Sequence, residues 1–353
     1  MDRMIPTPMY KDRITDASAW QPQDLCHGQT WNINLTNKQV DDLLSGLNQV
    51  KDLHIAEINR ANFPLPTCQD VIKQISDEMR TGRGFSLLHN FPVDGIKNED
   101  IARMYWGFCT YLGTGVTMGA KEYGGLVQDI TEGYNAGGAS RVGQPTVVPF
   151  HNDSADTAML LCVQQAIDSP KSQFVSSSTI HNVLRERAPD KLYRLYHGFP
   201  YDQLGLQYKT EPPITDPVPV FSQVDGLVSS QYNRSRITKA ADRSGGLSRE
   251  DESLFDLLDE TAQEFSFSYE FQPGDIQFAN NYVVWHGREA HKPATGEHDA
   301  RLLMRIWLNI DNFRRLSDEE IIRYAVLNGG TRGRSAHDVL KDLGDHIHPG
   351  ELT

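Results

Sequence analysis

Apolar residues in the first third of the chain recur three or four positions apart, which places them on one face of an α-helix. The pattern predicts helices that follow Thr36, begin near Thr67 and follow Asn98. Gln39 stands three residues after Thr36, a pairing typical of a capping box at the start of a helix. Between the second and third helices, the apolar run Gly84–Leu88 predicts a strand.

Beyond about residue 120, the spacing of apolar positions shifts toward two, as in strands that bury one face. Two helices interrupt this region, one near residues 180–186 and one that Ser248 opens. Many short strands separated by turn residues predict an α+β chain with a mainly β core, an antiparallel sandwich or barrel flanked by helices. The expected strands cover residues 126–131, 146–151, 157–163, 173–176, 265–271, 276–285 and 302–310.

The two ends of the chain lack these patterns, so we expect a single domain over residues 21–327. Residues 1–20 are polar and contain two prolines, which predicts a flexible N-terminal segment. This segment has no apolar stretch of the kind found in a secretory signal. Residues 328–353 are expected to form a C-terminal tail, and the sequence leaves open whether this tail covers the functional site.

Composition and charge narrow the class of protein. The chain has 353 residues, is 39% hydrophobic and carries a net charge of −13 without a basic patch, which argues against a nucleic-acid partner. No apolar run is long enough to predict a membrane span. Its four cysteines are widely scattered, which argues against a thiolate zinc site or a disulfide framework. We therefore expect a cytosolic protein that acts on a small molecule. The sequence does not decide whether the protein forms a homo-oligomer.

A candidate metal pair stands at the end of an expected strand. His151 and Asp153 are two residues apart, so in an extended segment their side chains point to the same side and can bind one ion. Such a pair arises readily by chance, and a surface histidine beside an acidic loop is the alternative interpretation.

The third ligand expected for this pair is a histidine far downstream. Two histidines and one carboxylate form the facial triad of non-haem Fe(II) oxygenases, which leaves three metal positions open. His286 directly follows the mostly apolar stretch 276–285, and the glycine after it lets the backbone turn. His291 and His298 are rival candidates, but both lie in a polar segment where solvated loop histidines are common.

Two arginines open the strand expected after His286. Arg301 and Arg305 are four residues apart and so share one face of that strand. A guanidinium that faces the interior of a barrel is costly unless an anion pairs with it, and the fork of a guanidinium matches a carboxylate. A dicarboxylate cosubstrate is one such partner; an internal ion pair with Asp or Glu is the other.

Together these residues resemble the taurine/2,4-D dioxygenase (TauD/TfdA) family of Fe(II)/2-oxoglutarate-dependent dioxygenases. The resemblance extends over roughly residues 20–315, and the combination of segments is more specific than any one of them. The segments that carry it are Phe150–Asp156, Leu160–Cys162, Phe174–Ser177, Asn280–Arg288 and Arg301–Leu308.

The resemblance implies a double-stranded β-helix (jelly-roll) core with Fe(II) held by His151, Asp153 and His286. It also implies that Arg301 binds the distal carboxylate of 2-oxoglutarate. Ser172 stands where the family places a Ser or Thr that contacts the same carboxylate. Arg305 matches an arginine that contacts the cosubstrate or the acidic group of the substrate.

The chain departs from the family pattern at two places. Ser169-Pro170-Lys171 stands where the family often has a Gly-Gly pair before the Ser or Thr. Tyr282 replaces an arginine that is frequent in the family.

The expected function is oxidation of an unactivated C–H bond with O₂ and release of succinate and CO₂, either as hydroxylation or as desaturation or ring closure. The substrate expected first is a small carboxylate or amino acid, and a sulfonate second. The glycine-rich segment 115–149 supplies the candidate substrate residues Tyr123, Asn135 and Arg141. The alternative is a metal-dependent hydrolase or isomerase that uses the same His/Asp/His site.

Overall fold

The computed structural model describes residues 8–26, 29–118, 122–131, 144–204, 212–296 and 298–316. Asn135, Arg141 and the expected tail 328–353 lie outside the described residues. Among the helices of the described chain, none is both long and apolar enough to cross a membrane.

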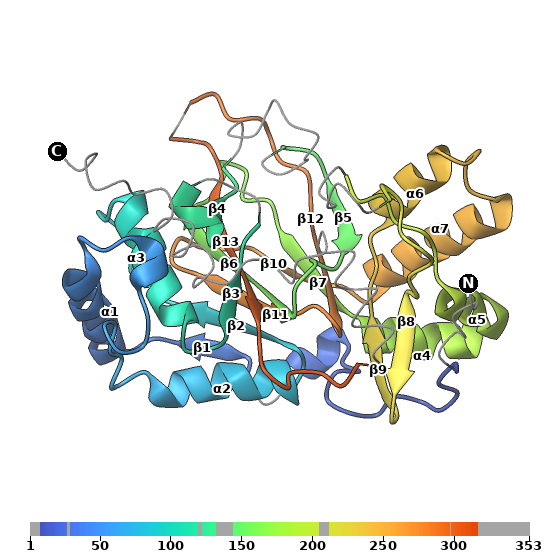
Figure 1. Cartoon of the computed structure of the whole chain (residues 1–353), viewed down its shortest axis with the longest axis horizontal. Coiled ribbons are helices and arrows are strands. Elements are labelled where there is room, and N and C mark those ends of the chain that lie inside the picture. Colours follow the sequence, from blue (N-terminus) through green and yellow to red (C-terminus); the bar gives the residue numbers. More distant parts are fainter. Residues whose placement is uncertain are drawn as a thin grey trace.

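The core consists of two β-sheets (Figure 1). The larger sheet has the order β1-β2-β11-β6-β13-β3, with β4 paired to β13; the smaller has the order β10-β7-β12-β5. Phe85 in the larger sheet stacks on Phe174 in the smaller one, with ring centroids 5.6 Å apart, so apolar faces of the two sheets meet. The larger sheet contains β1 (Asn32–Asn34), β2 (Phe85–His89), β3 (Thr114–Val116), β4 (Val127–Asp129), β6 (Thr157–Gln164), β11 (Ile276–Asn280) and β13 (Leu302–Asn309). The smaller contains β5 (Val148–His151), β7 (Ser172–Ser176), β10 (Phe267–Tyr269) and β12 (Val284–Arg288).

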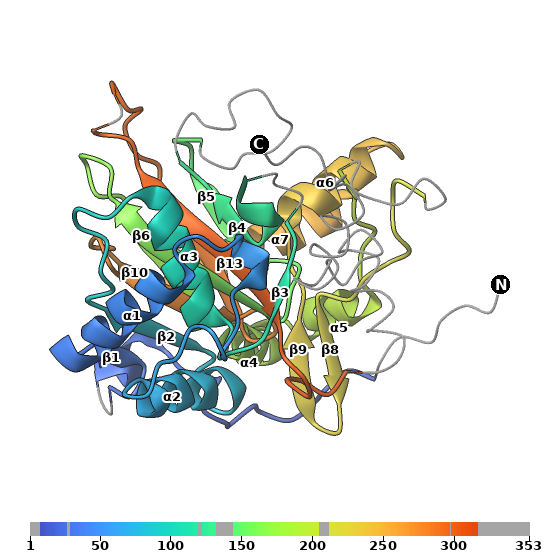
Figure 2. The same ribbon diagram turned by 60° about the vertical axis from the view of Figure 1, so that its left-hand side comes forward.

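Helices cover this core at two ends. In Figure 1 the first three α-helices lie together on one side of the sheets, and the other four lie on the opposite side with the hairpin β8–β9; Figure 2 shows the same grouping from another direction. The first group is α1 (Asn37–Val50), α2 (Gln69–Arg80) and α3 (Asn98–Cys109). The second is α4 (Ser177–Arg187), α5 (Pro189–His197), β8 (Phe221–Val224), β9 (Leu227–Ser230), α6 (Arg234–Asp242) and α7 (Arg249–Glu264). Short 3₁₀ turns occur at Pro22–Cys26, Ile55–Glu57 and Glu122–Gly125.

Local sequence accounts for the helix starts. Thr36 and Gln39 form the predicted capping box of α1, and the buried Leu43 and Leu47 lie one turn apart on its inner face. Ser248 caps α7 by accepting a hydrogen bond from the backbone N–H of Asp251 at 3.1 Å. These caps supply partners for backbone N–H groups that a helix leaves unpaired at its start.

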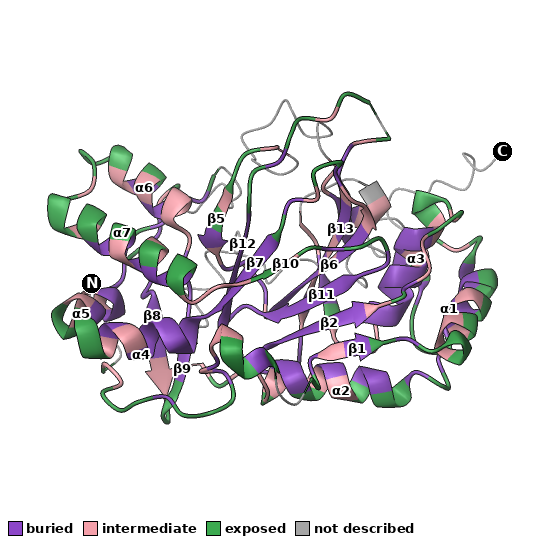
Figure 3. Ribbon diagram, turned by 180° about the vertical axis from the view of Figure 1, so that it is seen from behind, coloured by how far each residue is buried: buried purple, intermediate pink, exposed green. Residues whose placement is uncertain are grey.

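The strands are largely buried (Figure 3).

The described part of the expected flexible N-terminal segment, residues 8–20, also packs onto the domain. Ile14 and Trp20 are buried, and the backbone N–H of Ile14 donates to Asn182 Oδ1 at 2.8 Å. The Trp20 ring also packs on Phe85, with centroids 5.1 Å apart. The packed structure therefore extends back to residue 14 at least.

The expectation of one strand over residues 276–285 is wrong. The chain forms β11 in the larger sheet, turns at residues 281–283 and continues as β12 in the smaller sheet. Asn280 produces the turn, because its Oδ1 accepts a hydrogen bond from the backbone N–H of Tyr282 and its carbonyl accepts from Val283. All residues of both strands and of the turn are buried, so burial continues through the turn without a break.

Candidate active site

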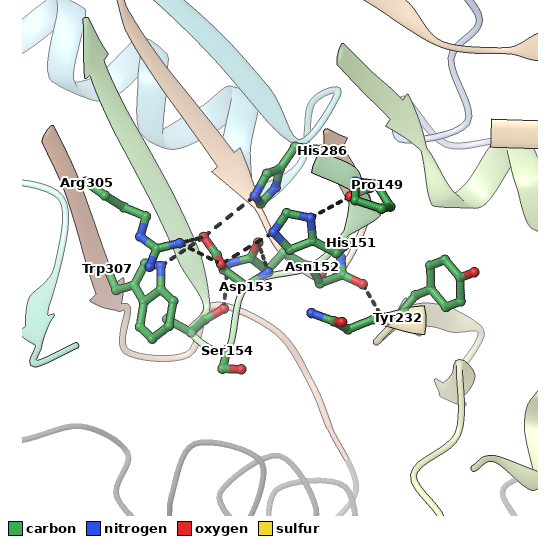
Figure 4. A network of polar contacts seen from close by, with 12 residues as sticks. Pro149, His151, Asn152, Asp153, Ser154, Tyr232, His286, Arg305 and Trp307 are labelled. Carbon is green, nitrogen blue, oxygen red and sulfur yellow. Dashed lines mark hydrogen bonds and ion pairs between the residues drawn. The ribbon is translucent and has the colours of Figure 1, made fainter. Parts of the chain in front are cut away.

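The two expected metal-binding histidines face each other on neighbouring strands. His286 lies in the middle of β12, directly opposite His151 at the end of β5, and the ring centroids are 4.4 Å apart (Figure 4). Because directly opposed side chains of paired strands point to the same side of a sheet, both imidazoles lie on one face. The pairing thus joins residues that are far apart in the sequence.

Asp153 completes this group from the loop after β5. Its Oδ1 is 3.8 Å from Nε2 of His151, and its Oδ2 is 3.7 Å from Nε2 of His286. The possible ligand atoms of the three residues all lie within 4.8 Å of one another, and no second such group of His, Cys, Asp or Glu occurs in the described residues. The structure therefore brings together the three residues that the sequence singled out.

Asparagine side chains fix the loop that carries Asp153. The buried side-chain amide of Asn152 donates to the carbonyl oxygens of Asn281 and, at 3.1 Å, of Val284. Its Oδ1 accepts from the backbone N–H of Tyr232 at 2.7 Å. In turn, Asn281 Oδ1 accepts from the backbone N–H of Asp153 at 3.2 Å. These two asparagines connect the ligand loop to the β11–β12 turn and to the segment after β9.

The protonation states of the histidines suit metal binding. Nδ1 of His151 lies 2.9 Å from the carbonyl oxygen of Pro149, an acceptor that holds the proton on Nδ1 and leaves the Nε2 lone pair directed toward Asp153. Burial, assisted by the neighbouring His151, lowers the pKa of His286 to about 3, so this imidazole is neutral near pH 7.

Asp153 is ionised despite its burial. Burial alone raises the pKa of this carboxyl group, but other effects, of which the charge of Arg305 is the largest, outweigh burial and lower the pKa to about 2. Two imidazoles and one carboxylate are a donor set that non-haem Fe(II) accepts, so the residues fit the metal expected from the sequence.

In addition to the two histidines, Arg305 and Trp307 lie against the Asp153 carboxylate (Figure 4). Nη1 of Arg305 donates to Oδ1 at 3.1 Å and to Oδ2 at 3.3 Å, and Nε1 of Trp307 donates to Oδ2 at 2.9 Å. Nη2 of Arg305 donates to Oε1 of Gln128 at 2.6 Å. Sequence reasoning missed Trp307, although its place two residues after Arg305 on one strand face was a usable signal.

Arg301 is a buried cation without a carboxylate partner among the described residues. The side chain is 7% exposed, and its Nε donates to Oε1 of Gln165 at 3.0 Å. Burial, followed by repulsion from Arg288, lowers the pKa of Arg301 to about 10. The internal ion pair with Asp or Glu that was the alternative for this arginine is therefore not found in the described residues.

Ser172 and Arg288 lie next to Arg301. Oγ of Ser172 is 3.5 Å from Nη2 of Arg301, and Ser172 stands directly opposite Arg288 in the pairing of β7 with β12. Arg288 donates to the carbonyl oxygens of Gln144 and Thr146. Sequence reasoning missed Arg288, although it lies two residues after His286 and thus on the same strand face.

The rival candidates lie elsewhere. His291 is buried, with Nδ1 3.0 Å from the carbonyl oxygen of Lys292, so it is not the solvated loop residue that was expected. His298 is exposed. Neither belongs to the group that the three ligand candidates form. Tyr123, a candidate for substrate contact, is half-buried and packs against the hydrophobic core.

Comparison with known proteins identifies the class. Residues 49–307 match the family described as Taurine catabolism dioxygenase TauD, TfdA family. The FR-33289 synthase of Streptomyces rubellomurinus is 26% identical over 323 residues, which cover 87% of this chain and 93% of that protein. The taurine hydroxylase-like protein SAT17 of Stachybotrys chartarum is 24% identical over 310 residues, 83% and 79% of the two chains. The chain belongs to the TauD, TfdA dioxygenase family.

Solved structures with the same fold confirm the predicted jelly roll with flanking helices. One is an asparagine oxygenase in complex with Fe(II), 2S,3S-3-hydroxyasparagine and succinate, with a TM-score of 0.63, 15% identity and coverage of 79% of this chain and 94% of that chain. Another is the non-haem iron oxygenase OrfP in complex with Fe and alpha-ketoglutaric acid, with a TM-score of 0.60, 13% identity and the same coverage.

The protein is therefore an oxidoreductase, an Fe(II)- and 2-oxoglutarate-dependent dioxygenase, as the sequence predicted. The alternative of a hydrolase or isomerase is not favoured, because that chemistry has no use for a buried, uncompensated Arg301.

Proposed function

We propose that His151, Asp153 and His286 hold the iron and that Arg301 binds the distal carboxylate of 2-oxoglutarate, with Ser172 beside it. The observation that carries this proposal is the buried guanidinium of Arg301 without an Asp or Glu partner in the described chain. An uncompensated buried cation is costly, and the distal carboxylate supplies the missing negative charge. Guanidinium and carboxylate also match as a bidentate pair.

The spacing along the small sheet supports this assignment. His286 stands opposite Phe174 in β7, and Arg288 stands opposite Ser172, two residues further along each strand. Two residues of a strand span about 7 Å. Ser172, the proposed partner of Arg301, therefore lies one strand repeat along β7 from the residue opposite His286.

When bound, iron with 2-oxoglutarate and O₂ supplies the oxidant that attacks an unactivated C–H bond, and succinate and CO₂ are released. The residues of the chain hold and orient the reactants. Arg301 and Ser172 fix the distal end of the cosubstrate, and the braced carboxylate of Asp153 keeps its place beside the two histidines. Such fixed positions favour reaction at one bond of the substrate.

Arg305 is proposed to contact the acidic group of the substrate or cosubstrate in addition to Asp153. Its Nε is buried and has no hydrogen-bond partner, whereas both terminal nitrogens are engaged by Asp153 and Gln128. The Nε–H group of this guanidinium is therefore left for an anion that enters beside the metal.

The proposed substrate is a small anionic or zwitterionic molecule, an amino acid or other carboxylate in the first place and a sulfonate in the second. The asparagine oxygenase of the same fold is described with a hydroxylated amino acid, and OrfP with L-Arg. The reaction on such a substrate is a hydroxylation, or a desaturation or ring closure when the substrate radical is held differently. We further propose that the enzyme acts in the cytosol, where its scattered cysteines stay reduced.

The test is a screen of amino acids, small carboxylates and sulfonates for succinate formation by the Fe(II)-loaded protein. We expect one class to raise succinate formation well above the rate without substrate, and Asp153→Ala to abolish the increase. Failure of every class, with iron shown to be bound, would argue against the proposed substrates. Formation of succinate by Asp153→Ala at the wild-type rate would argue against the proposed site.

A further inference from the structure

Trp307 contacts Asp153 and helps to keep the carboxylate in place. The indole Nε1 donates to Oδ2 of the carboxylate at 2.9 Å, so a side chain from the larger sheet reaches the candidate metal ligand. Trp307 is only half-buried and does not belong to the hydrophobic core. Its N–H group, rather than its apolar surface, is therefore what Trp307 contributes at this position.

Neighbouring groups hold Trp307 and Arg305 in place. The guanidinium carbon of Arg305 lies 4.8 Å from the centroid of the Trp307 ring, a cation–π contact. Gln128 stands directly opposite Arg305 in the pairing of β4 with β13 and accepts from its Nη2. The three side chains brace one another, so the donors that reach Asp153 have little freedom to move.

The two carboxylate oxygens of Asp153 accept different numbers of hydrogen bonds. Oδ2 accepts from Trp307 at 2.9 Å and from Arg305 at 3.3 Å, whereas Oδ1 accepts from Arg305 alone, at 3.1 Å. A carboxylate oxygen has two lone pairs. Oδ2 is thus fully occupied by donors from the protein, and Oδ1 keeps a lone pair.

We propose that Trp307, together with Arg305, makes Asp153 bind the metal through a single oxygen. A carboxylate that bound through both oxygens would take one of the three positions that a facial triad leaves for 2-oxoglutarate and O₂. Trp307 is in this sense a positioning residue, which acts on the metal through Asp153. This inference rests on the proposed function, because it takes Asp153 as an iron ligand.

The test compares Trp307→Phe with the wild type and with Trp106→Phe. Phenylalanine keeps an aromatic ring beside Arg305 but has no N–H group. Trp106 is the matched control, because its Nε1 donates to the carbonyl oxygen of Ile58, away from the metal candidates. Each protein is loaded with Fe(II) without oxygen and titrated with 2-oxoglutarate, and the visible charge-transfer band of the chelate reports binding.

We expect Trp307→Phe to retain iron but to bind 2-oxoglutarate roughly 10-fold more weakly, the order of effect that loss of a ligand's hydrogen-bond partner has. Trp106→Phe should follow the wild-type titration. A Trp307→Phe titration that superimposes on the wild type would overturn the inference. Absence of the band in the iron-loaded wild type would instead contradict the proposed function. The two failures can be told apart, because only the second affects the wild-type protein.

A second variant separates the N–H group from the bulk of the side chain. Histidine places a ring nitrogen at a comparable distance from the backbone, so Trp307→His keeps a donor for Asp153. We expect this variant to bind 2-oxoglutarate as the wild type does. Binding as weak as in Trp307→Phe would show that the N–H group is not responsible. If Trp307→Phe does not fold, Trp307→Leu takes its place, because leucine also lacks an N–H group, and the same criterion applies.

Discussion

His151 and His286 stand directly opposite each other in the pairing of β5 with β12, with ring centroids 4.4 Å apart. This relationship selects His286, and not the nearby His291, as the second histidine of the candidate metal site. We therefore predict that His286→Ala abolishes iron-dependent succinate formation and lowers the iron content after loading. His291→Ala is the control, with iron content close to that of the wild type. The reverse result would show that the ligand assignment is wrong.

Replacement of Arg301 by Met tests the buried cation. Arg301 lies in the interior without a carboxylate partner among the described residues, so its removal relieves a desolvation cost. We predict that Arg301→Met, without cosubstrate, unfolds at a temperature equal to or above that of the wild type. The variant should lose the rise in unfolding temperature that saturating 2-oxoglutarate gives the Fe(II)-loaded wild type.

The control for this variant is Arg187→Met, since Arg187 is exposed and pairs with Glu264 at the surface. It should retain the full stabilisation by 2-oxoglutarate. A stabilisation by 2-oxoglutarate that persists in Arg301→Met would mean that the distal carboxylate binds elsewhere.

Asn152 is predicted to support the stability of the ligand loop. Its side chain makes hydrogen bonds to Tyr232, Val284 and Asn281, all of them buried. Asn152→Ala leaves these backbone groups without partners, which costs about 1–3 kcal/mol for a buried group. We expect a decrease of this size in the free energy of unfolding, measured with denaturant. Asn59→Ala, at an exposed position, should have a smaller effect, and an equal effect would contradict the explanation.

His181 is predicted to make the protein sensitive to mild acid. This imidazole is buried in α4, with Nε2 2.9 Å from the Tyr196 hydroxyl, and burial lowers its pKa to about 4. The unfolded chain takes up the proton near its ordinary pKa of about 6.5. The contribution of neutral His181 to the free energy of unfolding is therefore fully present above about pH 6.5. It is lost as the pH falls toward 4.

The measurement is the free energy of unfolding near neutral pH and near pH 5. His181→Gln, which does not titrate in this range, should lose less stability between the two conditions than the wild type does. An equal loss in both proteins would show that other groups cause the acid sensitivity.

The sequence predicted the residues of the site better than the path of the backbone between them. The spacing of His151 and Asp153 and the position of His286 after an apolar stretch were enough to select the three residues that the structure groups. The turn at residues 281–283 was missed because apolar residues stand on both sides of it, although Asn280 and Asn281, a residue type typical of turns, mark it in the sequence. The sheet change at this turn is what sets His286 opposite His151.

The partners of the two arginines could not be predicted from spacing alone. Arg301 directly precedes β13 and Arg305 lies within it, and the two have different partners: Arg305 binds Asp153 and Gln128, whereas Arg301 binds Gln165 and lies beside Ser172. Those partners come from strands and loops distant in sequence, and only the register of β13 with β4 and β6 brings them together. Local periodicity contains no information on that register.

The most direct test of the proposed site is the addition of Fe(II) and 2-oxoglutarate to the wild-type protein in the absence of oxygen. We predict a weak visible charge-transfer band that saturates with 2-oxoglutarate, because the cosubstrate would bind to iron held by His151, Asp153 and His286. The band should be absent in Asp153→Ala. Bound iron with no band at any concentration of 2-oxoglutarate would contradict the central claim.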